Sequence, residues 1–156
     1  MVRTLFASCL LALAACGGGS APVPSATVPS AQQETVSRIG DVTIRATALQ
    51  TSTLAPEIAS QYGITRDDRT VMLLVGVRQG SDAQETALPA KITATVTNLS
   101  GQRQPVVLRE LRSGDLLDYV GTVETSLPDT LRFEINIVRE GGASSTMQFS
   151  REFYPR

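Results

Sequence analysis

The chain of 156 residues has no histidine and no tryptophan, and both of its cysteines lie among the first sixteen residues. Without histidine it has no Ser-His-Asp triad, no Cys-His pair and no imidazole ligand for a metal. No serine lies in the Gly-x-Ser-x-Gly or Ser-x-x-Lys patterns of activated nucleophiles. The single lysine, Lys91, stands at a polar position of a strand-like alternation, where it should face water. We therefore expect a protein that is not an enzyme and needs no cofactor.

The chain also lacks an excess of either charge. The chain has 14 basic and 15 acidic residues, for a formal net charge of −1. No run of lysine or arginine resembles the basic surface of a nucleic-acid-binding protein. Nucleic acid is therefore not an expected partner.

The amino-terminal residues have the three parts of an export signal. Arg3 precedes an apolar stretch over residues 5–13, which is far shorter than the ~20 residues that a transmembrane helix needs. The run Leu13-Ala14-Ala15-Cys16 resembles the lipobox at which bacterial lipoproteins are cut and acylated. An ordinary secretory signal that happens to contain cysteine is the alternative interpretation.

A lipobox predicts three regions in the chain. Residues 1–15 form the signal peptide, residues 16–37 form the acylated Cys16 and a disordered tether, and residues 38–156 form one domain. The tether is rich in glycine, serine, alanine and proline and cannot bury enough apolar surface to fold. The lipid bilayer is then a partner through Cys16. Because Gly17 replaces the aspartate common in inner-membrane lipoproteins, the periplasmic face of the outer membrane is the expected location.

Alternation of apolar and polar residues dominates the domain and predicts seven strands. The clearest alternation lies at residues 131–137, whereas residues 70–78 are almost all apolar and predict a strand buried on both faces. The predicted strands cover residues 41–48, 70–78, 90–97, 103–111, 116–124, 131–137 and 146–154.

One segment departs from this alternation. Residues 53–63 have proline near the start, glycine at the end, and Leu54, Ile58 and Tyr62 at four-residue spacing, which predicts a short helix. We expect this apolar stripe to plug one end of the sheets. The pattern favours an all-β fold, an immunoglobulin-like sandwich of about seven strands with one short helix between the first two. An eight-stranded barrel of lipocalin type is the alternative.

Residues 39–154 resemble a bacterial family of small exported envelope proteins known as domain of unknown function 4426. The matching pieces are Gly40-Asp41, residues 51–59, Tyr62-Gly63-Ile64-Thr65-Arg66, Asn98-Leu99-Ser100-Gly101-Gln102, Arg109-Glu110-Leu111, Leu131-Arg132-Phe133 and residues 149–154. The resemblance implies an immunoglobulin-like sandwich and lends no activity. The lipobox departs from the family, because many of its members look merely secreted.

Two arginines fall on apolar faces of the predicted strands. Arg109 shares its phase with two aliphatic residues, and Arg151 stands between two phenylalanines. A charge on an apolar face needs a partner. One interpretation pairs these arginines with a carboxylate such as Glu57 or Glu110, and the alternative turns them toward a ligand.

Tyr154, next to the carboxyl end, is the best candidate for a contact residue, because tyrosine is enriched at interfaces. The adjacent carboxylates Asp67 and Asp68 have no calcium-loop spacing around them and are expected to be structural. The candidate contact or ligand residues are Arg109, Glu110, Arg151 and Tyr154, and no metal site is expected.

Three functions remain open from these residues. The first is a non-catalytic module that binds an envelope protein, for instance by adding a strand at a sheet edge. The second is a small-ligand-binding lipoprotein in which Arg109 and Arg151 line an end pocket. The third is a hydrolase that uses carboxylates or tyrosine.

Overall fold

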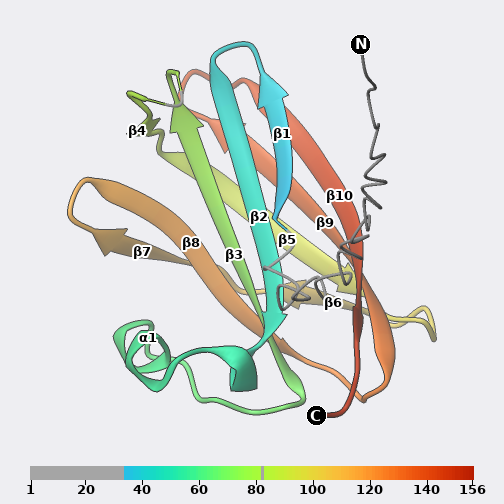
Figure 1. Ribbon diagram of the computed structural model, residues 1–156. Helices are drawn as coiled ribbons and strands as arrows, with labels where there is room; N and C mark the ends of the chain where they lie inside the picture. The colour runs from blue at the N-terminus through green and yellow to red at the C-terminus, as the bar shows by residue number, and fades with distance from the viewer. Residues whose placement is uncertain (1–33, 82) are drawn as a thin grey trace, which may run out of the picture.

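The protein is an all-β sandwich of two antiparallel sheets packed face to face (Figure 1). The computed structural model describes residues 34–81 and 83–156, so Cys16 and the predicted signal peptide lie outside the described residues. Within the described part of the chain, no helix is long and apolar enough to cross a membrane.

The larger sheet has six strands in the order β1-β2-β3-β8-β7, with β4 paired to β3. Its strands are β1 (Thr35–Ile39), β2 (Val42–Gln50), β3 (Thr70–Gln79), β4 (Thr86–Ala87), β7 (Arg109–Ser113) and β8 (Leu116–Glu124). Between β2 and β3 lie a 3-10 turn, η1 (Thr51–Thr53), and a short helix, α1 (Pro56–Gln61).

The smaller sheet has four strands in the order β10-β9-β5-β6. They are β5 (Ala90–Thr97), β6 (Arg103–Val106), β9 (Asp129–Arg139) and β10 (Ser144–Phe153). The order β2-β3-β8-β7 in one sheet and β10-β9-β5 in the other matches the A-B-E-D and G-F-C arrangement of immunoglobulin domains, with β6 as an additional strand beside β5. The prediction of an immunoglobulin-like sandwich is confirmed, and the lipocalin-type barrel is wrong.

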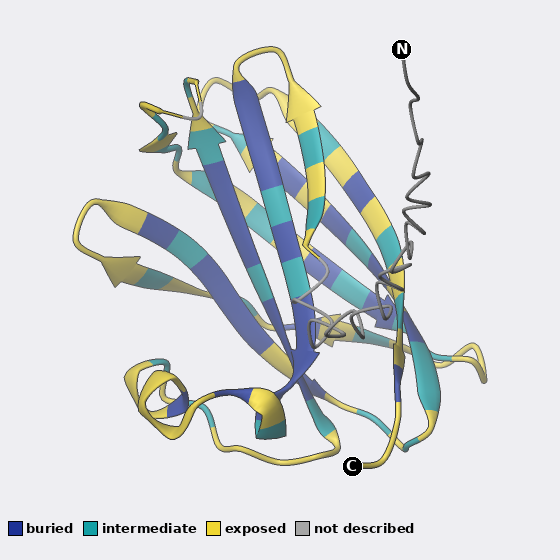
Figure 2. Ribbon diagram, viewed as in Figure 1, coloured by how far each residue is buried: buried dark blue, intermediate teal, exposed yellow. Residues whose placement is uncertain are grey.

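The inner core lies between the two sheets and is built from the alternating apolar positions of the strands (Figure 2). The four apolar residues of β9, from Leu131 to Ile137, are fully buried, as their alternation predicts. Phe133 stacks on Phe149 with 4.9 Å between ring centroids. Among residues 34–81 and 83–156, aliphatic and phenylalanine side chains supply most of this core, together with Tyr119 and Met147.

The predicted strand at residues 103–111 is wrong, because the chain changes sheets in its middle. β6 pairs with β5 in the smaller sheet, and β7 pairs with β8 in the larger one. Between them Val107 turns to solvent with 82% of its surface exposed. The crossing passes close to Gly121, where a Cβ atom would lie 2.4 Å from the Val107 carbonyl oxygen. Both halves carry strand-like residues, so alternation alone does not reveal the switch.

The predicted helix forms, but it is shorter and packs differently. Ile58 is exposed, whereas Leu54 and Ala59 are buried, so the predicted Leu54-Ile58-Tyr62 stripe is wrong. A six-residue helix has too few turns to bury a full stripe. The segment covers the outer face of the larger sheet, where a second set of apolar side chains, the outer cluster, is gathered. Its buried members are Leu49, Leu54, Ala59, Met72 and Val120.

The domain begins earlier than predicted. β1 starts at Thr35 and pairs with β2 from Thr35↔Ala46 to Ile39↔Val42, so residues 35–37, assigned to the tether, belong to the sheet. The apolar residues of this edge strand, Val36 and Ile39, are exposed. The strand therefore lacks the alternation of buried apolar and exposed polar residues by which the other strands were predicted. The helix therefore lies between the second and third strands.

Candidate functional site

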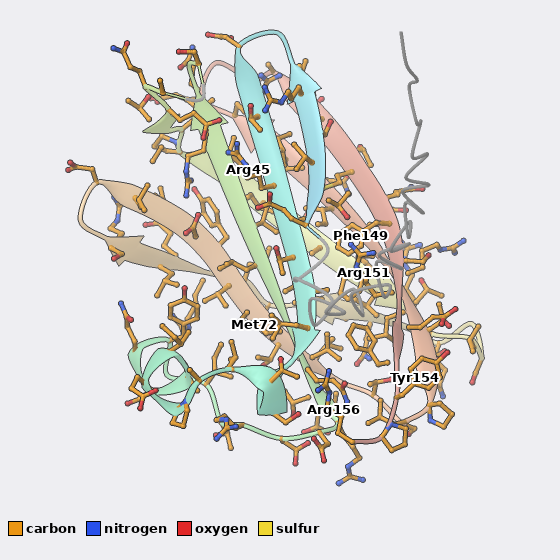
Figure 3. The ribbon with its side chains drawn as sticks, viewed as in Figure 1. Arg45, Met72, Phe149, Arg151, Tyr154 and Arg156 are labelled. Atoms are coloured by element: carbon orange, nitrogen blue, oxygen red, sulfur yellow. The ribbon has the colours of Figure 1, made fainter. Side chains whose placement is uncertain are left out.

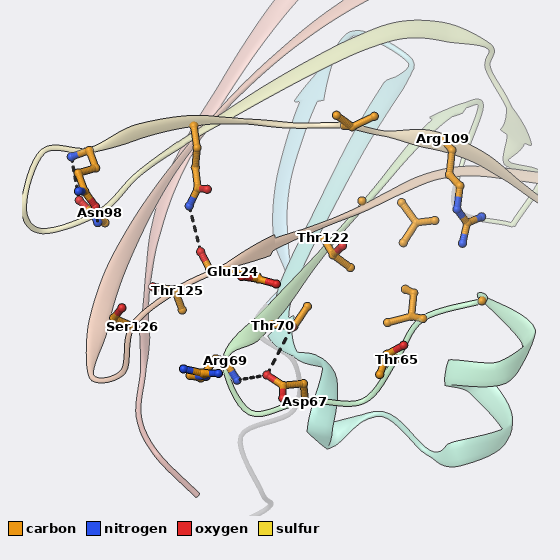
Figure 4. Close-up of a pocket in the computed structure, with 17 residues that line it drawn as sticks. Thr65, Asp67, Arg69, Thr70, Asn98, Arg109, Thr122, Glu124, Thr125 and Ser126 are labelled. Carbon is orange, nitrogen blue, oxygen red and sulfur yellow. Dashed lines mark hydrogen bonds between the residues drawn. The ribbon is translucent and has the colours of Figure 1, made fainter.

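A groove of about 990 Å³ lies beside the carboxyl end of β8 (Figure 4). Three segments border it: the loop from α1 to β3, the end of β8 with the turn that follows it, and the stretch from the β5–β6 turn to the start of β7. Most of its lining side chains carry hydroxyl or amide groups. They include Thr65, Thr70, Gln104, Thr122, Thr125 and Ser126.

Four charged side chains line the groove, and hydrogen bonds hold two of them, Asp67 within its own loop and Arg109 across to the end of α1. Asp67 Oδ1 accepts a hydrogen bond from the Arg69 amide at 2.7 Å and a longer one from Thr70 Oγ1 at 3.4 Å. The Arg109 guanidinium donates to the Tyr62 carbonyl at the end of α1. Asp67 is thus structural, in agreement with its interpretation from the sequence. No cluster of three metal-binding side chains occurs in residues 34–81 and 83–156.

Two polar residues missed by sequence reasoning position the loop wall. Gln50, which is buried, donates from Nε2 to the Asp68 carbonyl at 2.8 Å and to the Tyr154 carbonyl at 2.9 Å. The hydroxyl of the neighbouring buried residue, Thr51, donates to the Asp67 carbonyl at 3.1 Å and accepts from the Asp67 amide at 2.9 Å. A signal was present, because Gln50 continues the inward phase of Ala46 and Ala48, where a polar residue needs partners.

The strand at the groove floor is only partly paired. β7 pairs with β8 from Leu116 to Val120, and the chain then departs to the smaller sheet. From Gly121 to Glu124, β8 pairs with β3 alone, and no strand of the described part of the chain continues the line of β7 along it. The sheet switch at Val107 therefore leaves one side of β8 facing the groove.

The register tells which backbone groups face that side. In an antiparallel pair, alternate residues direct their N–H and C=O groups to one neighbour and the residues between them to the other. The Thr125 amide donates to the Arg69 carbonyl at 2.9 Å, on the β3 side. Thr122 and Glu124 are therefore directed toward the groove. The Glu124 carbonyl accepts from Gln104 Nε2 at 3.0 Å, as this phase requires.

The structure separates the two arginines that the sequence suggested as a pair. Arg109 lines the groove, and its guanidinium donates to the Tyr62 carbonyl instead of to a carboxylate, so the expected carboxylate partner is wrong for this residue. Glu110 instead pairs with Arg112 at 2.9 Å. Both side chains of that ion pair are more than half exposed, and such surface pairs contribute ~0–1 kcal/mol.

Arg151 lies on β10, outside the groove (Figure 3). Its guanidinium carbon sits 5.6 Å from the centre of the Phe149 ring, a cation–π arrangement. Its Nη2 atom approaches the Thr35 hydroxyl on β1 at 3.4 Å. Arg151 therefore bridges the edge strands of the two sheets and covers an end of the inner core, which explains a charge among phenylalanines.

Tyr154 follows the last strand and is 58% exposed (Figure 3). Its hydroxyl donates to Glu152 Oε2 at 2.7 Å. The pKa of Tyr154 is raised above its usual value, first because this hydrogen bond favours the protonated phenol and then because the carboxylate charge disfavours the phenolate. Tyr154 does not line the groove, so it forms a separate exposed surface.

Comparison with known proteins supplies a family. The family model described as domain of unknown function, DUF4426, matches residues 36–156. A crystal structure of a DUF4426 family protein from Pseudomonas aeruginosa is similar with a TM-score of 0.67 and 24% identity, over 80% of this chain and 98% of that one. A copper-bound variant of FetP from uropathogenic Escherichia coli is similar with a TM-score of 0.50 and 11% identity, over 76% and 93% of the two chains. No curated protein matches the chain.

Proposed function

The chain belongs to the DUF4426 family, and from that premise we propose that it is a non-catalytic protein-interaction module of the cell envelope. Its partner is another envelope protein, which it binds through the groove beside β8. The module is held at the periplasmic face of the outer membrane by acylated Cys16, a residue that lies outside the described part of the chain.

The observation that carries the proposal is the open groove with the partly paired strand at its floor. Its walls offer hydroxyl, amide and backbone groups, which suit hydrogen bonding to a polypeptide. Two of its charged side chains already have structural hydrogen bonds, Asp67 within its own loop and Arg109 to the end of α1. This arrangement supports contact binding rather than acid–base chemistry. The copper in the FetP structure is a property of that protein, and we do not extend it to a chain without histidine.

The lipid anchor has its own test. Replacing Cys16 with serine should abolish labelling by a radioactive fatty acid and leave the protein soluble or uncleaved. A Cys9→Ser variant, in which the leader loses its other cysteine, should be labelled like the wild type. Lipid-labelled membrane protein from the Cys16→Ser variant would refute the anchor while leaving the interaction proposal in place.

The interaction is tested by photo-cross-linking in living cells. A benzoylphenylalanine is placed in the full chain at Val107, on the groove, at Tyr154, on the carboxyl-terminal surface, or at Lys91, which is exposed on the smaller sheet. We expect Val107 to yield one discrete cross-linked envelope protein and Lys91 to yield none. Absence of a cross-link from all three positions contradicts the proposed function.

A small anionic ligand is the second candidate, because Arg69 and Arg109 both line the groove. The Arg69→Gln variant tests it. The substitution keeps the hydrogen bonds of Asp67, because Asp67 Oδ1 accepts from the Arg69 backbone amide and from Thr70 Oγ1. Inorganic phosphate at millimolar concentration should raise the melting temperature of the full wild-type chain and not that of the variant. An equal response of both proteins excludes this candidate.

A further inference from the structure

We propose that the partly paired end of β8 receives an extended segment of the partner protein as an added strand, in line with β7. This inference rests on the proposed function and specifies how the groove binds. The added strand would occupy the position in the larger sheet that the chain leaves when it crosses from β7 to β6.

The backbone of β8 presents the groups that strand addition needs. The register directs the N–H and C=O of Thr122 and the N–H of Glu124 toward the groove. Thr122 and Glu124 are exposed, and these two residues are separated by one that faces β3, which is the spacing of an antiparallel or parallel ladder. Beyond the last pair with β7, β8 continues to Glu124, and four residue steps separate Val120 from Glu124, about 14 Å at ~3.4 Å per residue, enough to pair with about four residues.

The position is also open in three dimensions. β8 lies at the floor of the 990 Å³ groove, the α1–β3 loop borders it on the outer side, and β6 lies on the other side in the smaller sheet. Exposed sheet edges are usually protected by lysine, proline or a covering loop. Here the Gln104 side chain covers part of the edge by donating a hydrogen bond to the Glu124 carbonyl. The backbone N–H and C=O of Thr122 still face the groove. Figure 4 shows Thr122 facing the groove between Arg109 and Glu124.

The lining indicates the chemistry of the occupant. Two arginines and two carboxylates balance each other, so the groove has no net charge to attract a strongly acidic or basic peptide. Ile64 and Val120 lie on the outer side of the sheet and Val107 on the opposite wall, and threonine hydroxyls stand between them. An extended segment with small, uncharged side chains on both faces fits this lining, because backbone pairing supplies its affinity and shallow contacts accept its side chains.

The test separates backbone pairing from side-chain recognition. In cells that carry benzoylphenylalanine at Val107 of the full chain, the cross-link yield is compared for Thr122→Pro and Thr122→Ala. Proline removes the N–H that faces the groove and keeps the β3 ladder, whereas alanine removes the side-chain hydroxyl and methyl groups and keeps the N–H. We expect Thr122→Pro to lower the yield about tenfold, the effect of one lost hydrogen bond with its crowding, and Thr122→Ala to change it less than about twofold.

Protease resistance in the periplasm checks that the proline variant folds. If Thr122→Pro fails this check, Glu124→Pro replaces it, because it removes a second N–H with the same direction at the last residue of the strand. Peptide mass spectrometry of the cross-linked product identifies the segment, which should be extended and uncharged.

Each other outcome overturns part of the reasoning. Equal yields from a folded proline variant and from wild type exclude strand addition and leave the interaction module intact. A cross-link to residues 17–33 of the same chain shows that the tether, and not a partner, occupies the groove. Cross-links from Tyr154 without any from Val107 move the interface elsewhere, which refutes this inference and the groove as the binding surface but leaves the interaction module itself in place. A complete lack of cross-links refutes the proposed function with it.

Discussion

The two sheets of the sandwich differ in how many faces they bury. β3, at the centre of the larger sheet, is buried on both sides, with Val71 and Leu73 in the inner core and Met72 in the outer cluster. β9, at the centre of the smaller sheet, alternates between the inner core and solvent (Figure 2). The outer face of the smaller sheet carries Lys91 and threonines in contact with water.

This difference shows why the chain needs the segment between β2 and β3. A sheet with apolar residues on both faces requires a second cover, which η1, α1 and the following loop supply over part of the outer face. The rest of that face is polar and is covered by ion pairs, Arg45–Glu85 at 2.7 Å and Arg78–Asp118 at 2.5 Å. The groove lies where this cover meets the sheet switch, so the larger sheet carries both the second core and the candidate site.

The largest expected effect is in the inner core. Leu131 is fully buried on β9 and belongs to the inner core, to which both sheets contribute side chains. Leu131→Ala should lower the free energy of unfolding by about 3–5 kcal/mol. Urea unfolding of the full chain in detergent measures it. The loss should appear in every probe at once, since the inner core joins both sheets.

The same substitution in the outer cluster should cost less. Leu54 is buried beneath the short helix, and Leu54→Ala should lower the free energy of unfolding by about 2–3 kcal/mol. Because α1 has only six residues, its amides should exchange with solvent before those of β9. If both variants lower the free energy of unfolding equally, and if the amides of α1 and β9 exchange equally fast, the two cores unfold as one unit. That result would contradict the difference between the two sheets.

A smaller effect is expected at the end of the larger sheet. Gln50→Ala removes the two hydrogen bonds that Nε2 donates to the loop and to the carboxyl-terminal segment, and leaves the Asp68 and Tyr154 carbonyls without those donors. We expect a loss of about 1–3 kcal/mol and faster proteolysis near Asp68. Thr53→Ala is a suitable control, because its hydroxyl bonds only its own turn. If both variants are equally protease-resistant, the loop is held by other contacts.

The smallest effect concerns the smaller sheet at Tyr154. Its raised pKa means that the folded protein keeps the phenol proton longer than the unfolded chain does. The stabilisation is therefore complete below pH 10 and is lost as the pH rises through the raised pKa. Tyr154→Phe should remove this slope in alkaline urea titrations and, because the lost hydrogen bond is solvent-exposed, should lower stability at pH 7 by only a small amount. Glu152→Gln, by removing the carboxylate, should return the Tyr154 absorbance titration toward its ordinary midpoint.

Much of the fold could be predicted because alternation reports burial directly. Residues 131–137 alternate because one face meets the inner core, and residues 70–78 are continuously apolar because both faces are covered. The helix at residues 53–63 was found from its proline and glycine, but its packing was not, since Ala59 rather than Ile58 meets the sheet. The prediction of one continuous strand over residues 103–111 failed because the chain changes sheets at Val107 while its residues remain typical of a strand.

The candidate site was harder to predict from the sequence. Arg109 was identified as unusual for its phase, and it does line the groove, but its contact is a backbone carbonyl that no side-chain pattern encodes. Arg151 and Tyr154 were grouped with it and lie elsewhere. The unpaired side of β8 has no sequence signature, because Thr122 and Glu124 look like ordinary solvent-facing strand residues.

The amino-acid sequence by itself determined which residues face the cores, since period-two alternation and apolar runs follow from the geometry of a pleated strand. It also determined the absence of histidine and the membership in a family. Only the tertiary structure decided which strands become neighbours, where the chain changes sheets, and which side of β8 has no partner strand within residues 34–81 and 83–156. These depend on contacts between residues far apart in the chain, such as Gly121 with Val107 and Gln50 with Tyr154, and no local pattern carries that information.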